Sequence, residues 1–342
     1  MPKATKETIQ NALLDSIVVG NQSVAATVAA EFGLSRQTVS KYLRDLVNLD
    51  AIKVTGAGRS TKYELVVQSK EQRIPITSKL DEHKIWEALM TDFLEHLSEN
   101  ERLICFHGFT EMVNNAIDHS EGQELHVTVS KTARYVMFMV QDNGVGIFNK
   151  ITKALNLVDP RQSLLELSKG KFTTDPARHS GEGIFFTSRM FDAFTILSDN
   201  YALIHDGLHD WFFELKEKKL LGTKVVMNLL LPSKRTTKEI FDQYSSGPDD
   251  YSFARTHVPL NLARYGQDEL VSRSQAKRVL ARVERFEEVS LDFTGVAYVG
   301  QAFADEIFRV FKTQNPSIKL IYVGATDDVK KMIHRAMSHV SE

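Results

Sequence analysis

The residue types that could do chemistry are concentrated in four short stretches of the chain. These are EMVNNAIDH from residue 111, DNGVGI from residue 142, HSGEGI from residue 179 and GT at residue 222. Together they offer carboxylates, an amide, histidines and closely spaced glycines, which are the parts of a pocket for a nucleoside triphosphate and its metal ion. The sequence therefore predicts a site that binds ATP with Mg²⁺.

The first stretch places an acid and an amide side by side. Apolar residues recur around it at helical spacing, so we expect a helix. Glu111 and Asn115 share another face of it because they are four positions apart. The carboxylate can orient and deprotonate a water molecule, and the oxygen of the Asn115 amide suits Mg²⁺. His119 lies one turn further along and is placed to reach a phosphate.

The second and third stretches place an acid and glycines at the ends of regular elements. Residues 135–140 form an apolar run typical of a strand, which ends at Asp142 with Gly144 and Gly146 behind it. A carboxylate there can accept a hydrogen bond from the amine of adenine. Residues 169–183 are polar and glycine-dotted and lead into a helix expected over 184–194. We call residues 169–183 the lid, because this pattern is typical of a mobile phosphate cover that ends at a helix N-terminus.

Each stretch also has an ordinary structural interpretation. The sequence DNG at Asp142 is typical of a turn. Glu111 and Asn115 fit the solvated face of an amphipathic helix, and Gly181 and Gly183 fit the start of another helix. The four stretches occur in this order, each on the expected kind of element, and together they favour a nucleotide pocket over these separate interpretations.

The four stretches resemble the N, G1, G2 and G3 boxes of the GHKL ATPase superfamily, which includes histidine kinases, DNA gyrase, mismatch-repair ATPases and anti-sigma-factor kinases. The resemblance implies an α/β sandwich over residues 81–232, with helices on one face of a mixed sheet. It implies Glu111 as general base, Asn115 as Mg²⁺ ligand and Asp142 as adenine acceptor. The other candidate nucleotide contacts are His119, Gly144, Gly146, Ser180, Gly181, Gly183 and Thr223. The lid matches no box, so its remaining candidates, Lys171, Thr173, Thr174 and Arg178, come from residue type alone.

Residues 1–67 show the pattern of a DNA-reading domain. The apolar spacing predicts helices over residues 6–18, 24–32 and 35–49. Gly33 permits a tight turn between the second and the third helix. Residues 52–66 alternate and turn back as a β-hairpin. The segment therefore resembles the winged helix-turn-helix of bacterial transcription regulators.

In that arrangement the third helix enters the major groove of DNA and the hairpin acts as the wing. The resemblance suggests DNA contacts from Arg36, Gln37, Thr38, Ser40, Lys41 and Arg44 on the helix and from Arg59 and Lys62 on the wing. The expected partner is double-stranded DNA with a repeated half-site, bound by a homodimer. Basic residues at these positions equally fit a solvated face, and some winged domains bind only proteins.

Two polar segments, residues 68–80 and 233–250, are interpreted as linkers, the second around a short helix. Residues 251–342 then alternate strand and helix, which predicts a small α/β domain. The run VSLDFTGV from residue 289 resembles the STAS-like domain of anti-sigma antagonists. In those proteins a Ser or Thr at the start of the next helix accepts a phosphoryl group, whereas residues 300–302 are Gly, Gln and Ala here. We expect this domain to bind a protein partner.

The composition fits two or three globular domains, because the 342 residues are 42% hydrophobic and 25% charged, with a net charge of -2. The single cysteine, Cys105, excludes a disulfide framework and fits a reducing compartment. No stretch approaches the roughly 20 consecutive apolar residues of a membrane span, and the N-terminus does not read as a secretion signal. We therefore expect a cytoplasmic protein that does not bind membranes.

Two functions of different classes follow from these features. The first is a transcription regulator in which ATP binding or hydrolysis by the GHKL-type domain changes the DNA affinity of the winged helix. The second is a serine/threonine protein kinase similar to the anti-sigma-factor kinases, acting on a partner or on the STAS-like domain. The absence of hydroxyl residues at 300–302 disfavours the kinase. The sequence leaves ATP hydrolysis itself open.

Overall fold

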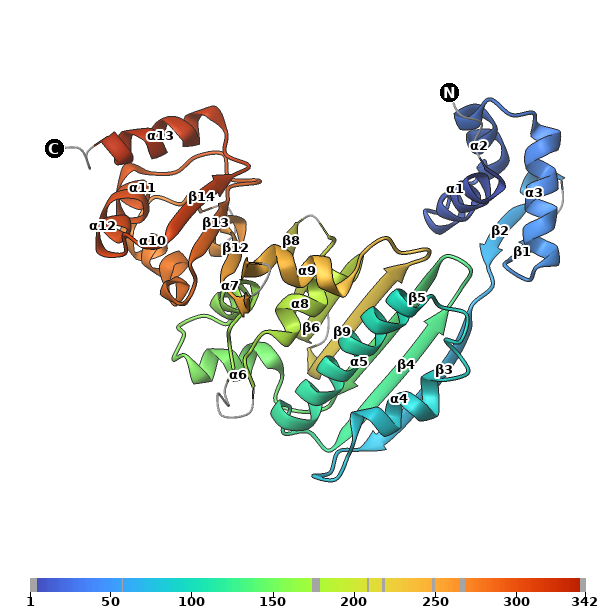
Figure 1. The fold of residues 1–342 in the computed structure, drawn as a ribbon, viewed down its shortest axis with the longest axis horizontal. Coiled ribbons are helices and arrows are strands. Elements are labelled where there is room, and N and C mark those ends of the chain that lie inside the picture. The colour runs from blue at the N-terminus through green and yellow to red at the C-terminus, as the bar shows by residue number, and fades with distance from the viewer. Residues whose placement is uncertain are drawn as a thin grey trace.

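A computed structural model of the protein describes residues 5–56, 58–173, 179–207, 209–216, 219–247, 250–264 and 268–338. Three bodies follow one another along the chain (Figure 1): a small domain of helices and a hairpin, a central sheet with helices, and a small α/β domain. Within the described ranges, none of the helices is both long and apolar enough to cross a membrane.

The centre of the molecule is a seven-stranded sheet in the order β3-β4-β5-β9-β6-β7-β8. Its strands are β3 (Gln68–Pro75), β4 (Glu124–Lys131), β5 (Tyr135–Asp142), β6 (Ala193–Asp199), β7 (Tyr201–His205), β8 (Asp210–Glu214) and β9 (Leu220–Leu230). Neighbouring strands pair antiparallel. Short turns, such as residues 132–134, connect β4 to β5, β6 to β7 and β7 to β8, whereas longer stretches of chain connect the other neighbours. Among the strands in the described residues, the parallel pairings lie in the C-terminal sheet.

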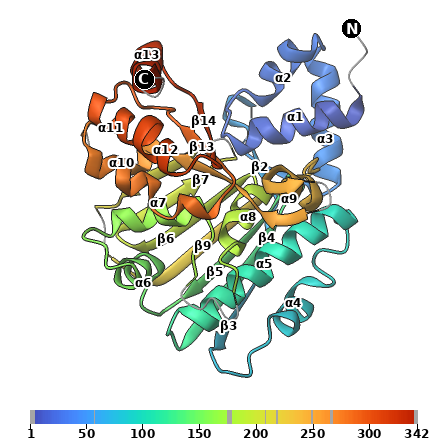
Figure 2. The same ribbon diagram turned by 60° about the vertical axis from the view of Figure 1, so that its left-hand side comes forward.

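Helices cover one face of the central sheet, which confirms the expected α/β sandwich (Figures 1 and 2). They are α4 (Glu82–Met90), α5 (Glu99–His119), α6 (Ile147–Ala154), α7 (Arg161–Lys169) and α8 (Gly183–Met190). A capping box of Ser98 and Glu101 starts α5, and the helix packs on β5 and β9. Phe109 and Val113 of α5 and Phe138 of β5 are completely buried. This packing fixes which face of α5 is left for the site.

Two segments of this domain differ from the sequence-based expectation. The first part of the expected linker 68–80 forms β3, which pairs with β4 along its whole length. The polar pattern is misleading there because a strand at a sheet edge needs backbone pairing rather than an apolar face, and Pro75 is tolerated at an edge. The helix expected over 184–194 ends at Met190, and Phe194 lies in β6 instead.

The N-terminal domain has three helices and a hairpin in the predicted order. They are α1 (Lys6–Val18), α2 (Val24–Phe32), α3 (Arg36–Asn48), β1 (Ile52–Thr55) and β2 (Lys62–Leu65). Gly33 ends α2 with a φ of 62° and allows the tight turn into α3. The hydroxyl of Ser35 accepts a hydrogen bond from the backbone N–H of Thr38 and caps that helix. The buried side chains of this domain form a core of their own.

The C-terminal domain is built on a parallel three-stranded sheet. Its main elements are β12 (Arg255–Pro259), α10 (Arg273–Leu280), β13 (Glu288–Asp292), α11 (Gln301–Asp305), the π-helical segment η4 (Glu306–Phe311), α12 (Lys312–Gln314), β14 (Lys319–Val323) and α13 (Asp327–Ser338). Its core is continuous with the core of the central domain. The segment between the two, interpreted as a second linker, holds α9 (Thr237–Tyr244), which packs on α8, and the short strands β10 (Ser245–Gly247) and β11 (Asp250–Phe253).

Candidate nucleotide-binding site

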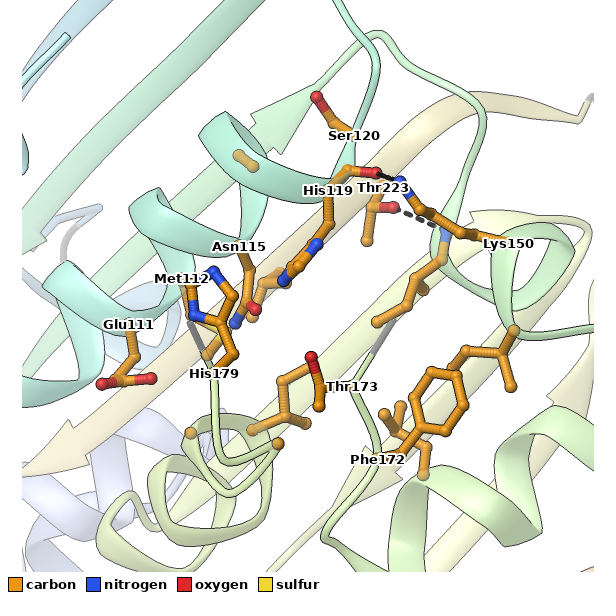
Figure 3. Close-up of a pocket in the computed structure, with 18 of the residues that line it drawn as sticks. Glu111, Met112, Asn115, His119, Ser120, Lys150, Phe172, Thr173, His179 and Thr223 are labelled. Carbon is orange, nitrogen blue, oxygen red and sulfur yellow. Dashed lines mark hydrogen bonds between the residues drawn. The ribbon is translucent and has the colours of Figure 1, made fainter. Parts of the chain in front are cut away.

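Residues from all four sequence stretches line one cavity of about 270 Å³. Glu111, Asn115 and His119 lie along α5 on one side of it, in successive turns (Figure 3). Asp142 and Thr223 come from the ends of neighbouring strands, and glycines of the third stretch also contribute to the wall. The fold therefore brings together stretches that are far apart in the sequence.

Asp142 is held rigidly at the end of β5. Its side chain is almost fully buried, and its Oδ1 accepts hydrogen bonds from the backbone N–H groups of Gly144, at 2.8 Å, and Thr223, at 3.2 Å. Burial raises the pKa of this carboxyl, and the hydrogen bonds from Gly144 and Thr223 oppose that rise. Gly222 has a φ of 78° and passes so close that a Cβ would lie 2.1 Å from the carbonyl oxygen of Asp142. The carboxylate is therefore presented to the cavity as a fixed hydrogen-bond acceptor.

The glycines of the motifs divide into two groups. Gly146, Gly181 and Gly183 line the cavity. A Cβ on Gly183 would lie 1.9 Å from Oε2 of Glu111, so only glycine lets the start of α8 approach that carboxylate. Gly144 is not among the lining residues, and its nucleotide contact stays a prediction. Its tight contact is with the backbone of Ser120, where a Cβ would lie 1.9 Å from the carbonyl oxygen.

Replacing Gly144 with alanine should therefore destabilise the fold. The new methyl group would meet backbone rather than a flexible side chain, and overpacking of this kind costs roughly 1–3 kcal/mol. A denaturant titration should show an earlier unfolding midpoint than in the unmodified protein. Gly247→Ala is the matched control, because a Cβ there would meet nothing within 4 Å. An equal effect of both substitutions would contradict the role given to Gly144.

The surroundings of Glu111 shift its pKa in the way expected for a catalytic acid or base. Burial raises its pKa, and the nearby His179 lowers it in part. A carboxyl whose pKa is raised in this way takes up a proton more readily than a solvated one, as a general base must. Asn115 and His119 line the cavity one and two turns further along α5. The three predicted α5 residues are thus placed on the cavity side of the helix.

The lid agrees only in part with the sequence-based expectation. Thr173, Ser180 and Gly181 line the cavity. Lys171, expected to reach phosphate, instead donates a hydrogen bond from Nζ to the carbonyl oxygen of Arg285 at 3.0 Å, in the C-terminal domain. Lys171 thus contacts the C-terminal domain in this structure, and its phosphate contact stays a prediction. The candidates Thr174 and Arg178 lie outside the described residues.

Two polar residues of the cavity were given no role from the sequence. Lys150 of α6 donates to the carbonyl oxygen of His119 at 2.6 Å and to Oε1 of Glu121 at 3.1 Å. Nε2 of His179 lies 3.1 Å from Oδ2 of Asp118, and its ring centroid lies 4.8 Å from that of His119. His179 stands in the third motif, which is the signal that could have identified it, whereas Lys150 looks like any lysine on an amphipathic helix.

The donor set and the shape of the cavity fit a nucleotide with Mg²⁺. The oxygen ligands that Mg²⁺ prefers are available from Asn115 and Glu111. Apolar side chains complete the wall near Asp142 and offer a surface to a flat purine: Val140, Ile147, Ile151 and Val225. In the sequence these residues cannot be distinguished from ordinary core residues. Asn115 would hold the metal ion, which when bound neutralises phosphate charge, and Asp142 would hold the base.

The residues predicted to contact DNA lie on the N-terminal domain. Those exposed on α3 and β2 are Arg36, Gln37, Ser40, Lys41, Arg44 and Lys62. Thr38 is half-buried and its hydroxyl lies 2.9 Å from that of Ser35, so its place is in the helix cap. The side chain of Arg59 lies outside the described part of the structure.

Comparison with known families agrees with the geometry of the central domain. Residues 100–229 match the model of the histidine kinase-, DNA gyrase B-, and HSP90-like ATPase family. Residues 275–330 match the model of a STAS-like domain of unknown function. A search among curated proteins finds no match to the chain. The first match contains all four motifs, and the N-terminal domain lies outside both.

Proposed function

We propose that this chain, whose central region is a histidine-kinase-like ATPase domain, is a transcription regulator in which ATP and Mg²⁺ in the central cavity change the DNA affinity of the N-terminal domain. The observation that carries the proposal is the single cavity bounded by all four motifs. It supports nucleotide binding because a fixed acceptor, a carboxylate and an amide face one space.

The exposed face of α3 supports DNA as the second ligand. Arg36, Lys41 and Arg44 leave their charges in solvent on the helix that follows the tight turn. Exposed cations on such a helix are suited to phosphates and to base edges in the major groove. A wing with exposed Lys62 stands beside it. A dimer would place two such helices on a repeated half-site.

The connection between the two domains supports coupling. Only Val66 and Val67 separate the wing strand β2 from β3, which is part of the central sheet. Arg134, in the turn between β4 and β5, donates from Nη2 to Oδ2 of Asp15 in α1 at 3.1 Å. The N-terminal domain is therefore attached at two places, so a change in the central sheet can alter how α3 is presented.

A DNA-selection assay without nucleotide, with ADP and with a nonhydrolysable ATP analogue tests the proposal. We expect one nucleotide state to enrich a duplex sequence that the others do not. Enrichment that is identical in all three states would remove the regulatory switch, and no enrichment in any state would remove DNA as the ligand.

The double substitution Lys41→Ala and Arg44→Ala should weaken binding to the selected duplex. Each lost phosphate contact lowers the slope of log affinity against log salt concentration by about 1, so we expect a fall of about 2. Lys331→Ala is the control, because it also removes one positive charge but lies on the exposed side of α13. An unchanged salt slope in the double variant would show that α3 does not face DNA phosphates.

A protein kinase acting on Ser or Thr is the alternative, and the C-terminal domain gives it little support. Residues 300–302 carry no hydroxyl. Thr294, at the end of β13, is tied into the strand end, with its backbone N–H donating to Oδ1 of Asp292 at 2.8 Å. Incubation with radiolabelled ATP separates the two functions, since a kinase leaves label on protein and the proposed regulator does not.

A further inference from the structure

The first residue of the lid is buried against the C-terminal domain. Lys169, which ends α7, is only 1% exposed. Its Nζ donates to Oε1 of Glu166 at 2.6 Å and to the carbonyl oxygens of Arg278 and Ala281 at 3.0 and 2.9 Å. A lysine has three N–H donors, and all three have acceptors here. Full pairing is what allows a buried ammonium group to remain charged although burial lowers its pKa.

The acceptors come from the end of a helix in the C-terminal domain. The carbonyl oxygens of Arg278 and Ala281 belong to the last turn and the cap of α10, where helix carbonyls lack partners and a positive charge is favoured. Arg282 follows directly, with a φ of 65°. Its Nη1 donates to Oε2 of Glu166 at 3.1 Å, so both oxygens of that carboxylate are used. Lys169 and Glu166 thus join α7 to the end of α10 through hydrogen bonds in which all their charged atoms have partners.

The same contacts continue into the wall of the nucleotide cavity. The hydroxyl of Thr256 in β12 donates to the carbonyl oxygen of Lys169 at 2.7 Å. The guanidinium of Arg282 donates to the carbonyl oxygen of Lys171 and lies 5.1 Å from the ring centroid of Phe172. Phe172 lines the cavity (Figure 3). The backbone before Phe172 is therefore held by the C-terminal domain at two carbonyl groups, those of Lys169 and Lys171.

Gly170 and Phe253 allow the start of the lid to pack closely against the segment that leads into the C-terminal domain. Gly170 has a φ of 77°, and a Cβ there would lie 2.6 Å from the ring of Phe253. Phe185, which follows the lid in α8 and lines the cavity, packs on the same Phe253 ring with centroids 4.5 Å apart. Gly170, near the start of the lid, and Phe185, just after its end, therefore both lie against Phe253, which ends β11 directly before the C-terminal sheet. Figures 1 and 2 show α7 beside that domain.

We infer that Lys169 is a positioning residue of the nucleotide site, through which the C-terminal domain sets the place of the cavity wall at Phe172 and Thr173. This inference rests on the proposed binding of ATP. Any ligand that shifts α10 changes nucleotide affinity, and nucleotide changes the affinity for that ligand by the same factor. The STAS-like domain is then the part of the protein at which a ligand regulates nucleotide binding.

The substitution Lys169→Met tests the inference, because it leaves an unbranched side chain only one heavy atom shorter and removes the three hydrogen bonds to Glu166 and α10. Lys277→Met is the matched control: Lys277 is an exposed lysine of α10, 3.9 Å from Glu306 and away from the cavity. Calorimetry with a nonhydrolysable ATP analogue and Mg²⁺ should show affinity about tenfold lower in Lys169→Met. The Lys277→Met protein should match the unmodified one. Equal affinity in all three proteins would overturn the inference.

Hydrogen exchange on the unmodified protein gives a second measurement that does not depend on a variant folding. The ATP analogue should slow exchange of backbone amides in residues 275–286 and leave α13 unchanged. Binding of the analogue without slower exchange in 275–286 would overturn the inference and leave the proposed function intact. Absence of any binding to the unmodified protein would instead overturn the proposed function.

Discussion

Replacing Glu111 with glutamine is expected to lower the rate of ATP hydrolysis at least about 100-fold, because a positioned general base contributes roughly 10²–10⁴ to a rate. Glutamine has nearly the same size, so it fits beside Gly183, where a Cβ would already lie 1.9 Å from the carboxylate. The affinity for ATP should change little. Phosphate release and calorimetry on the same preparation measure the two effects separately.

Glu99→Gln is the control for this substitution, because Glu99 lies in the exposed first turn of the same helix and outside the cavity. It should hydrolyse ATP at the rate of the unmodified protein. A Glu111→Gln protein that keeps the full rate would show that the attacking water is activated elsewhere.

The pH profile of hydrolysis should carry the signature of the same residue. A base acts when deprotonated, so the rate falls as the pH drops through the pKa of Glu111. Burial raises that pKa and His179 lowers it in part, so the fall begins at higher pH than for a solvated glutamate. His179→Gln removes the lowering contribution and should move the fall further toward neutral pH. A shift in the opposite direction would contradict the proposed pairing of charges.

Replacing Asp142 with asparagine should weaken the binding of ATP and ADP about 30-fold. Oδ1 of Asp142 already accepts from the N–H groups of Gly144 and Thr223. An asparagine would keep its oxygen there and turn its NH₂ group toward the adenine amine, so an acceptor becomes a donor. Losing a hydrogen bond to a charged group costs about 2 kcal/mol, which corresponds to about 30-fold in affinity.

Calorimetry measures this change, and Asp199→Asn is its control, because Asp199 ends another strand of the same sheet outside the cavity. Thermal unfolding of both variants shows whether they remain folded. If a folded Asp142→Asn protein binds ATP as tightly as Asp199→Asn does, the base is held by other residues and the assignment of the cavity fails.

The motif residues could be predicted because their arrangement depends on local sequence. Asp142 is the last residue of a strand, and the glycines behind it allow the turn that this position needs. Glu111 and Asn115 share a helix face by spacing alone. The four motifs meet in one cavity because the sheet order places β5 next to β9, and none of the four stretches predicts that order by itself.

The lid could not be predicted in the same way because its contacts are long-range. Lys169 and Lys171 stand in a polar, glycine-dotted stretch, which is typical of a solvated loop. Their partners, the carbonyl oxygens of Arg278 and Arg285, lie in another domain. A lysine that binds phosphate has the same local sequence pattern as a lysine that donates hydrogen bonds to the end of a distant helix. For Lys169 that helix is α10, more than 100 residues further along the chain.

Because β3 follows the wing so closely, the outermost strand of the ATPase sheet is made by residues that the sequence assigns to a connector. A fragment beginning at residue 81 would leave one side of β4 with unpaired amide and carbonyl groups, and an open edge of that kind favours aggregation. A fragment that keeps the central sheet intact must therefore retain Gln68–Pro75. The boundary between the first two domains thus falls at Val66 and Val67, before the edge strand and not after it.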